Sequence, residues 1–144
     1  MAEGAFFVHA ADRTASRRFM VASAGTCGNQ KGAPPDPRAV SAAAGFGIDI
    51  ASLRARCVDD FDLASFDRIF VMDYKNYEDV VGLTDRAERV RLVMSFVPGR
   101  VHEEVLDPYY GSELSFRRVM ADLFLACGYI FDALADRYPD SGVQ

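Results

Sequence analysis

The clearest hydrophobic pattern lies near the C-terminus, where apolar residues recur at three- and four-residue spacing from about 113 to 138. This spacing predicts one long amphipathic helix. Its apolar positions are Phe116, Val119, Met120, Leu123, Phe124, Cys127, Ile130, Phe131 and Leu134. Because Cys127 lies on this apolar face, it is expected to be a core residue rather than a reactive thiol.

Three other stretches are apolar runs, which are typical of strands buried on both faces of a parallel sheet. Residues 17–26 predict a strand that runs into a turn of small residues. Residues 67–73 predict a second strand, which ends on an aspartate, and residues 89–97 predict a third, which stops at Pro98-Gly99.

Helical segments separate these strands. Residues 2–12 predict a helix without an N-terminal capping residue, whereas Asp36 and Pro37 form a clear start for a second helix. Residues 59–66 and 74–83 predict two more. Strands that alternate with helices indicate an α/β fold with a parallel sheet. Such chains usually begin on a strand and bind a ligand at the turn into the first helix, but this sequence begins within a helix.

Composition narrows the class of protein. The 144 residues fit a single domain, 1–144, and a chain that is 50% hydrophobic and 26% charged is expected to be globular. A net charge of -5 without a basic stripe argues against nucleic acid as a partner. No apolar run approaches the roughly 20 residues that span a bilayer, and the N-terminus lacks a basic secretory start. We therefore expect a cytoplasmic protein with no membrane partner.

The three cysteines, Cys27, Cys57 and Cys127, are widely spaced. They form no C-x-x-C pair and no cluster with histidine, so the sequence supports neither a disulfide framework nor a zinc site. We expect reduced thiols, no bound metal and no other cofactor.

One loop combines residues that carry chemistry. Asp107 is followed by Pro108, two adjacent tyrosines and Gly111 in the segment DPYYG. Proline and glycine predict a turn, which is neither strand nor helix. A general acid held beside an aromatic clamp for a flat substrate is one interpretation. A solvent-facing turn with two half-buried tyrosines is the other.

Several motifs occur together, in an order and at a spacing that match one family. They are MAEGAF at 1–6, SAGT at 23–26, PPDPRAV at 34–40, RAR at 54–56, FDRIFVMD at 66–73 and DPYYG at 107–111. Over essentially its whole length the chain resembles the low-molecular-weight protein tyrosine phosphatases. The resemblance implies a three-layer α/β/α fold around a small parallel sheet of order 2-1-3-4, of which this chain lacks the first strand.

The resemblance also implies roles for particular residues. Asp107 would be the general acid that protonates the leaving tyrosyl oxygen. Tyr109 and Tyr110 would form the aromatic wall against the substrate ring. Ser23 would be a hydroxyl that orients the phosphate loop, and Asp73 would lie near the same rim. The implied substrate of a full-length form is a phosphotyrosine protein or a small aryl phosphate.

In that family a loop of the form C-x-x-x-x-x-R, which supplies the nucleophile and the phosphate cradle, comes directly before MAEG. No cysteine of this chain has arginine six positions later, because the residues there are Ala33, Leu63 and Ala133. One hypothesis is an N-terminally truncated phosphatase, inactive as given. The alternative is a natural non-catalytic binding or regulatory protein, since Leu53 and Asn29 also depart from the residues that relatives often have. An arsenate reductase is disfavoured because residues 74–97 contain no cysteine.

The missing strand also predicts a stability cost. Strands 17–24 and 67–73 would lose the partner they share in the family, and each unpaired buried backbone group costs ~1–3 kcal/mol. We expect the 144-residue chain to be marginally folded or prone to aggregation.

Overall fold

A long C-terminal helix organises the computed structural model, which describes residues 1–12, 19–26 and 28–137. This helix, α4, spans Glu113–Arg137 and confirms the predicted amphipathic helix. Its buried residues are Phe116, Met120, Leu123, Ala126, Cys127, Ile130, Phe131 and Leu134. Two predicted core positions, Val119 and Phe124, are only partly buried. No helix within the described ranges is long and apolar enough to cross a membrane.

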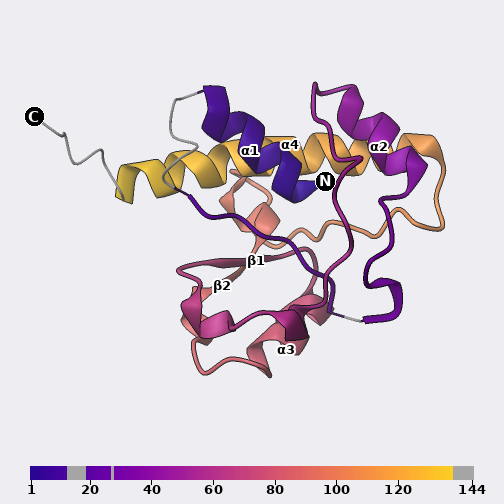
Figure 1. Cartoon of the computed structure of the whole chain (residues 1–144). Coiled ribbons are helices and arrows are strands. Elements are labelled where there is room, and N and C mark those ends of the chain that lie inside the picture. The colour runs from indigo at the N-terminus through magenta and orange to yellow at the C-terminus, as the bar shows by residue number, and fades with distance from the viewer. Residues whose placement is uncertain (13–18, 27, 138–144) are drawn as a thin grey trace, which may run out of the picture.

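Two helices pack on α4 (Figure 1). They are α1, Ala2–Asp12, and α2, Pro37–Ala44, and both confirm predictions from the sequence. The predicted start of α2 is present, because the Asp36 carboxylate accepts a hydrogen bond from the Arg38 amide at 2.8 Å and Pro37 occupies the first turn.

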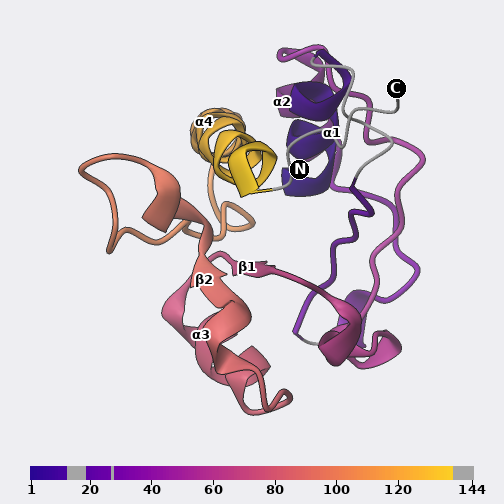
Figure 2. The ribbon, with the colours of Figure 1, turned by 90° about the vertical axis from the view of Figure 1, so that its left-hand side faces the viewer.

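The described part of the chain contains one parallel sheet of two strands. Strand β1, Ile69–Val71, pairs with β2, Val90–Leu92. Helix α3, Tyr74–Val81, covers one face through a small apolar cluster made of Val71, Val80, Val90 and Leu92. Phe70 and Met72 pack toward the main core on the other face. The predicted α/β fold with a small parallel sheet is therefore confirmed, and Figure 2 shows the helix layer, the sheet and α3 in succession.

The strand predicted at 17–26 is wrong for the residues that can be assessed. Residues 17 and 18 lie outside the described part, and residues 19–24 form no ladder there. The backbone of this segment pairs with a neighbouring one through an isolated parallel bridge between Gly25 and Cys57. Its hydrogen bonds run from Gly25 N to Arg56 O (2.9 Å) and from Val58 N to Gly25 O (2.9 Å). A strand needs a partner to form its ladder, and β1 pairs with β2 instead.

The strand predicted at 89–97 is half right. After β2 the chain turns into the 3₁₀ helix η5, Val93–Phe96. The Ser95 hydroxyl donates to the Leu92 carbonyl at 2.6 Å, a local bond that competes with a continued ladder. A short apolar run does not distinguish a buried strand from a buried helical turn, and η5 packs on α4 within the core.

The remaining elements are single 3₁₀ turns. The helix predicted at 59–66 is two such turns, η2 at Val58–Asp60 and η3 at Leu63–Ser65. The others are η1 at Gly28–Gln30 and η4 at Ala87–Arg89.

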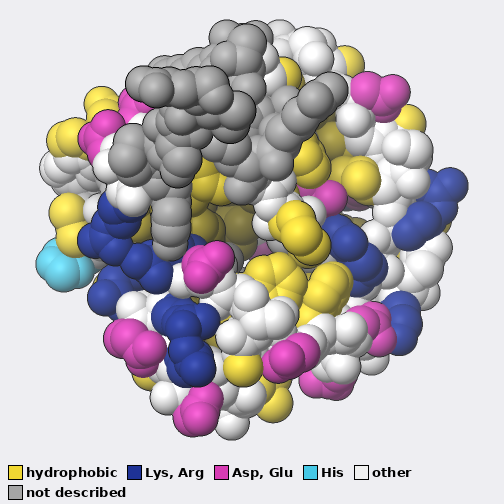
Figure 3. Space-filling model, turned by 60° about the vertical axis from the view of Figure 1, so that its left-hand side comes forward, with side chains coloured by type: hydrophobic (Ala, Val, Ile, Leu, Met, Phe, Trp, Pro, Cys, Tyr) yellow, Lys and Arg dark blue, Asp and Glu magenta, His cyan; other side chains and the backbone are white. Residues whose placement is uncertain are grey.

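The segment 19–26 leaves apolar surface only partly covered. Phe19 and Val21 pack against the main core but are half-buried, as are Phe70 and Met72 on the sheet. Met20 is 98% exposed, so it contributes little to the core. Figure 3 shows hydrophobic side chains within a hollow on one face of the molecule, beside a group of basic side chains.

Helix α1 approaches residues 48–50 so closely that Gly4 is required. A Cβ added at Gly4 would lie 2.6 Å from Cγ2 of Ile48 and 3.0 Å from Cγ2 of Ile50. We predict that Gly4→Ala lowers the free energy of unfolding by about 1–3 kcal/mol through overpacking. The matched control is Gly45→Ala, where φ is -61° and the nearest atom is 3.4 Å away, so a change within about 1 kcal/mol is expected. Equal urea midpoints for the two variants would contradict the close packing.

Candidate functional site

The loop that contains Asp107 is attached to the carboxyl end of β1. The Val105 amide donates to the Met72 carbonyl at 2.8 Å, and the Val105 side chain is buried. One residue earlier, Glu104 Oε1 accepts from the Tyr74 amide at 2.7 Å. The carboxyl end of a parallel strand is the usual place for ligands in α/β sheets.

The same loop is bound at its other end by one side chain. Arg38 donates from Nη1 to the Gly111 carbonyl at 2.8 Å and from Nη2 to the Tyr109 carbonyl at 3.0 Å. Asp36 holds the guanidinium, and the hydrogen bonds from Arg38 lower the pKa of that carboxyl below its usual value. The turn is thus joined to the start of α2.

Asp107 and the two tyrosines lie on the surface of this turn. Asp107 is exposed, and its Oδ1 accepts from the Tyr109 amide at 3.0 Å. The rings of Tyr109 and Tyr110 are perpendicular, with centroids 5.1 Å apart. Tyr109 is 48% exposed and Tyr110 is 97% exposed, so both have aromatic surface available to a ligand. The sequence also allowed a turn with two half-buried tyrosines. Tyr109 is about half-buried, but Tyr110 is not.

Asp73 and Ser23 have local structural partners. Asp73 caps α3, because its Oδ1 accepts from the Asn76 amide at 2.6 Å. Asn76 also contacts Thr26, at 3.5 Å between Nδ2 and Oγ1, which joins the segment 19–26 to the start of α3. Asp73 follows Met72, so it shares the carboxyl end of β1 with the Asp107 loop. Ser23 donates to Glu3 Oε2 at 2.5 Å, at the start of α1.

Glu3 binds Ser23, one of the candidate site residues, and the sequence analysis did not single it out. It is 9% exposed, and its Oε2 accepts from Ser23 and, at 2.7 Å, from Arg56 Nη2. One buried carboxylate therefore joins α1, the segment 19–26 and the RAR motif. An acid in the first turn of a helix is a weak signal by itself, because the helix dipole favours it there on any surface helix.

We predict that removal of the Arg56 guanidinium lowers the free energy of unfolding, because the Glu3 carboxylate loses its charged partner. Arg56→Met leaves a buried carboxylate with one neutral donor, and we expect a loss of about 1–3 kcal/mol in unfolding free energy. The loss is smaller than for a fully buried ion pair, because the Arg56 side chain is 38% exposed. Arg54→Met is the matched control, since Arg54 is exposed and donates to backbone carbonyls of nearby residues, and it should change stability by less than about 0.5 kcal/mol.

The double variant Glu3→Gln with Arg56→Met should recover part of the loss, because it removes the uncompensated charge. Urea unfolding of the four proteins in this double-mutant cycle measures the coupling. Strictly additive effects would show that Glu3 and Arg56 do not interact.

The described cysteines are buried and free. Cys57 is one, and Cys127 is the other, as predicted for a core position. Cys27 lies outside the described residues. Burial raises the pKa of the Cys127 thiol to about 12, and the nearby N-terminal amino group offsets only part of this effect. Because the thiolate is the reactive form, Cys127 is a poor nucleophile near neutral pH.

The raised pKa of the Cys127 thiol predicts that stability depends on pH. It ionises in the unfolded chain near pH 9 but in the folded chain only near pH 12. Its stabilising contribution is therefore complete below pH 9 and is lost as pH rises above it, at about 1.4 kcal/mol per pH unit. We predict that Cys127→Ala flattens the decline of unfolding free energy between pH 9 and 11. Parallel curves for the two proteins would contradict this assignment.

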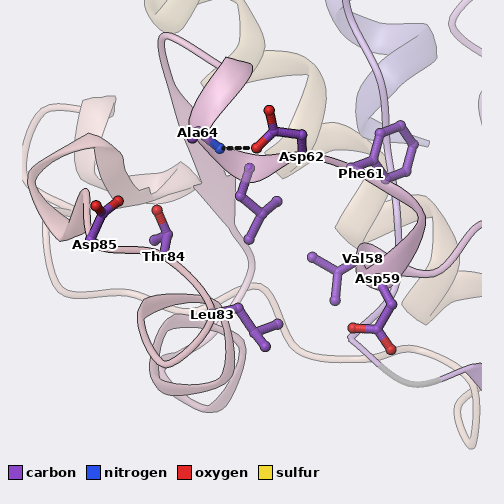
Figure 4. Close-up of a pocket in the computed structure, with 9 residues that line it drawn as sticks. Val58, Asp59, Phe61, Asp62, Ala64, Leu83, Thr84 and Asp85 are labelled. Atoms are coloured by element: carbon purple, nitrogen blue, oxygen red, sulfur yellow. Dashed lines mark hydrogen bonds between the residues drawn. The ribbon is translucent and has the colours of Figure 1, made fainter.

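A pocket of about 380 Å³ lies elsewhere, between η2, η3 and the segment that follows α3 (Figure 4). Carboxylates of Asp59, Asp62 and Asp85 surround it, together with apolar side chains such as Leu83. No residue of the Asp107 loop lines it. Within the described residues no group of three or more His, Cys, Asp or Glu is placed to hold a metal ion.

Comparison with known proteins places the chain in one family. The family model described as "Low molecular weight phosphotyrosine protein phosphatase" matches residues 1–138. The chain is 30% identical over 131 residues to the Homo sapiens protein of that description, covering 88% of this chain and 82% of the relative. It is 31% identical over 115 residues to a putative low molecular weight protein-tyrosine-phosphatase of Synechocystis, covering 78% and 73%.

Solved structures agree with this assignment. A protein tyrosine phosphatase from Entamoeba histolytica superposes with a TM-score of 0.88 at 28% identity, covering 95% of this chain and 88% of that one. YfkJ from Bacillus subtilis, at 24% identity and a TM-score of 0.84 over 96% and 87% of the two chains, supports the fold alone. The chain therefore belongs to the low molecular weight phosphotyrosine protein phosphatase family.

Proposed function

We propose that this chain supplies the general acid and the aromatic wall of a phosphotyrosine phosphatase site. Asp107 would protonate the leaving tyrosyl oxygen and then deprotonate the water that hydrolyses a phosphocysteine intermediate. The observation that supports this most is the attachment of the Asp107 turn at both ends, through Val105 to Met72 and through Arg38 to Tyr109 and Gly111. An acid held in this way keeps its distance to a bound ester oxygen.

The tyrosine pair supports an aromatic substrate. Two perpendicular rings with exposed faces offer both stacking and edge contacts to a phenyl ring. The substrate class is therefore a phosphotyrosine protein or a small aryl phosphate. The same proposal includes a cytoplasmic location, where reduced thiols such as those of Cys57 and Cys127 persist.

Ser23 and Asp73 would support the site without contact with the reacting atoms. The Ser23 hydroxyl, which donates to Glu3 from within the segment 19–26, would orient a phosphate-binding loop. Asp73 would keep the rim in position through its cap on α3.

These 144 residues contain no nucleophile of the required kind. Neither the sequence nor the described cysteines offer a C-x-x-x-x-x-R loop, so we propose that the chain as given is inactive. Activity would require a strand and phosphate loop from residues beyond those given.

A non-catalytic binding protein is the second candidate. The absence of the nucleophile motif favours it, as do Leu53 and Asn29 at positions where relatives often have other residues. In that case the free amides at the start of α1 would be the available anion site. Burial lowers the pKa of the Met1 amino group beside them, which reduces its charge and hence its attraction for an anion.

We predict that the purified 144-residue chain does not hydrolyse p-nitrophenyl phosphate. The reason is that an acid without a nucleophile does not form the cysteinyl-phosphate. Release of p-nitrophenol is the measurement, with Asp107→Asn as the matched variant. Turnover by the unaltered chain that Asp107→Asn abolishes would contradict the prediction.

The mass of the protein in its source cell, with its N-terminal peptide, decides between the two candidates. A longer product with C-x-x-x-x-x-R ahead of Met1 supports the phosphatase. A product that starts at Met1 supports the binding protein.

A further inference from the structure

Arg38 joins two parts of the chain that are distant in sequence. Its two terminal nitrogens donate to the carbonyls of Gly111 and Tyr109, which lie 73 and 71 residues away. Its own position is at the start of α2. A single guanidinium thus binds two backbone groups of the turn that carries Asp107.

The guanidinium is itself held in place from two sides. Asp36 accepts from Nε at 3.0 Å through Oδ1 and from Nη2 at 2.7 Å through Oδ2, which is a two-point contact in one plane. The ring of Phe116, which is 3% exposed, lies below the guanidinium at 4.4 Å. Arg38 is therefore oriented by α2 and by the first turn of α4, and little side-chain freedom remains to be lost when it binds the loop.

The turn transmits this position to the acid. Tyr109 donates its amide to Asp107 Oδ1 at 3.0 Å, and the Gly111 amide donates to the Pro108 carbonyl at 2.8 Å. A Cβ at Gly111 would lie 2.5 Å from Ser115 Oγ, so the turn is also packed tightly against the start of α4. With Val105 bound to Met72 on the other side, Asp107 lies between two fixed points.

We propose that Arg38 is the positioning residue that sets the orientation of Asp107 and of the Tyr109 ring. Its importance for catalysis rests on the proposed function, whereas its effect on the loop does not. Lysine would not replace it, because the two carbonyls, the two carboxylate oxygens and the aromatic face match a planar guanidinium and not a point charge.

Residue-resolved hydrogen exchange of the 144-residue chain tests this inference. In Arg38→Met, which keeps an apolar stem over Phe116, the amides of Tyr109 and Gly111 should exchange about tenfold faster, since two charge-assisted hydrogen bonds are lost. Arg38→Lys should give an intermediate rate. The matched control is Arg89→Met, because Arg89 also donates to two backbone carbonyls, those of Ala64 and Phe66, and it should leave both amides unchanged.

A purely structural role for Arg38 within α2 predicts a different pattern. The amide of Val40, bonded to the Asp36 carbonyl, would then exchange faster while Tyr109 and Gly111 would not, and this result would overturn the inference. An equal effect of Arg89→Met on the turn would also overturn it. Since exchange requires no turnover, failure of the positioning role is distinguishable from failure of the proposed phosphatase function.

Discussion

Burial of one face of α4 is the interaction on which the rest of the structure depends. Helices α1 and α2 and the turn η5 all pack on it, and together with α4 they supply most of the residues of the main core. The burial is also what places the site, because Phe116 in the first turn of α4 lies in the core and supports Arg38 from below. The Asp107 turn therefore takes its position from the core at one end and from β1 at the other.

Local signals in the sequence predicted the α-helices well, whereas the helix predicted at 59–66 is two 3₁₀ turns. The apolar spacing of α4 and the Asp36-Pro37 start of α2 act within a few residues, so no knowledge of the fold is needed to read them. Strands differ because their ladder depends on a partner distant in sequence. Residues 19–24 have the composition of a strand but form no ladder. Residues 93–96 form a 3₁₀ turn instead of continuing β2, and the Ser95 hydroxyl donates to the Leu92 carbonyl.

The site shows the same division between local and distant information. The sequence predicted the turn at 107–111 and singled out Asp107 and its tyrosines, because proline, glycine and the family motif are contiguous. It did not predict that Arg38 binds this turn from 71 residues away. Nor did it predict that Glu3 binds both Ser23 and Arg56, the latter 53 residues away. Asp73, singled out by its place after a strand, has a clear local role as the cap of α3.

The proposed chemistry of the chain is that of a phosphatase site that has its acid and aromatic wall but lacks its nucleophile. The most direct test is a search for covalent phosphate on cysteine after incubation of the purified chain with a phosphotyrosine peptide, by mass spectrometry of the intact protein quenched in acid. The account predicts no gain of one phosphate mass on Cys27, Cys57 or Cys127. A cysteinyl-phosphate on any of the three would contradict it.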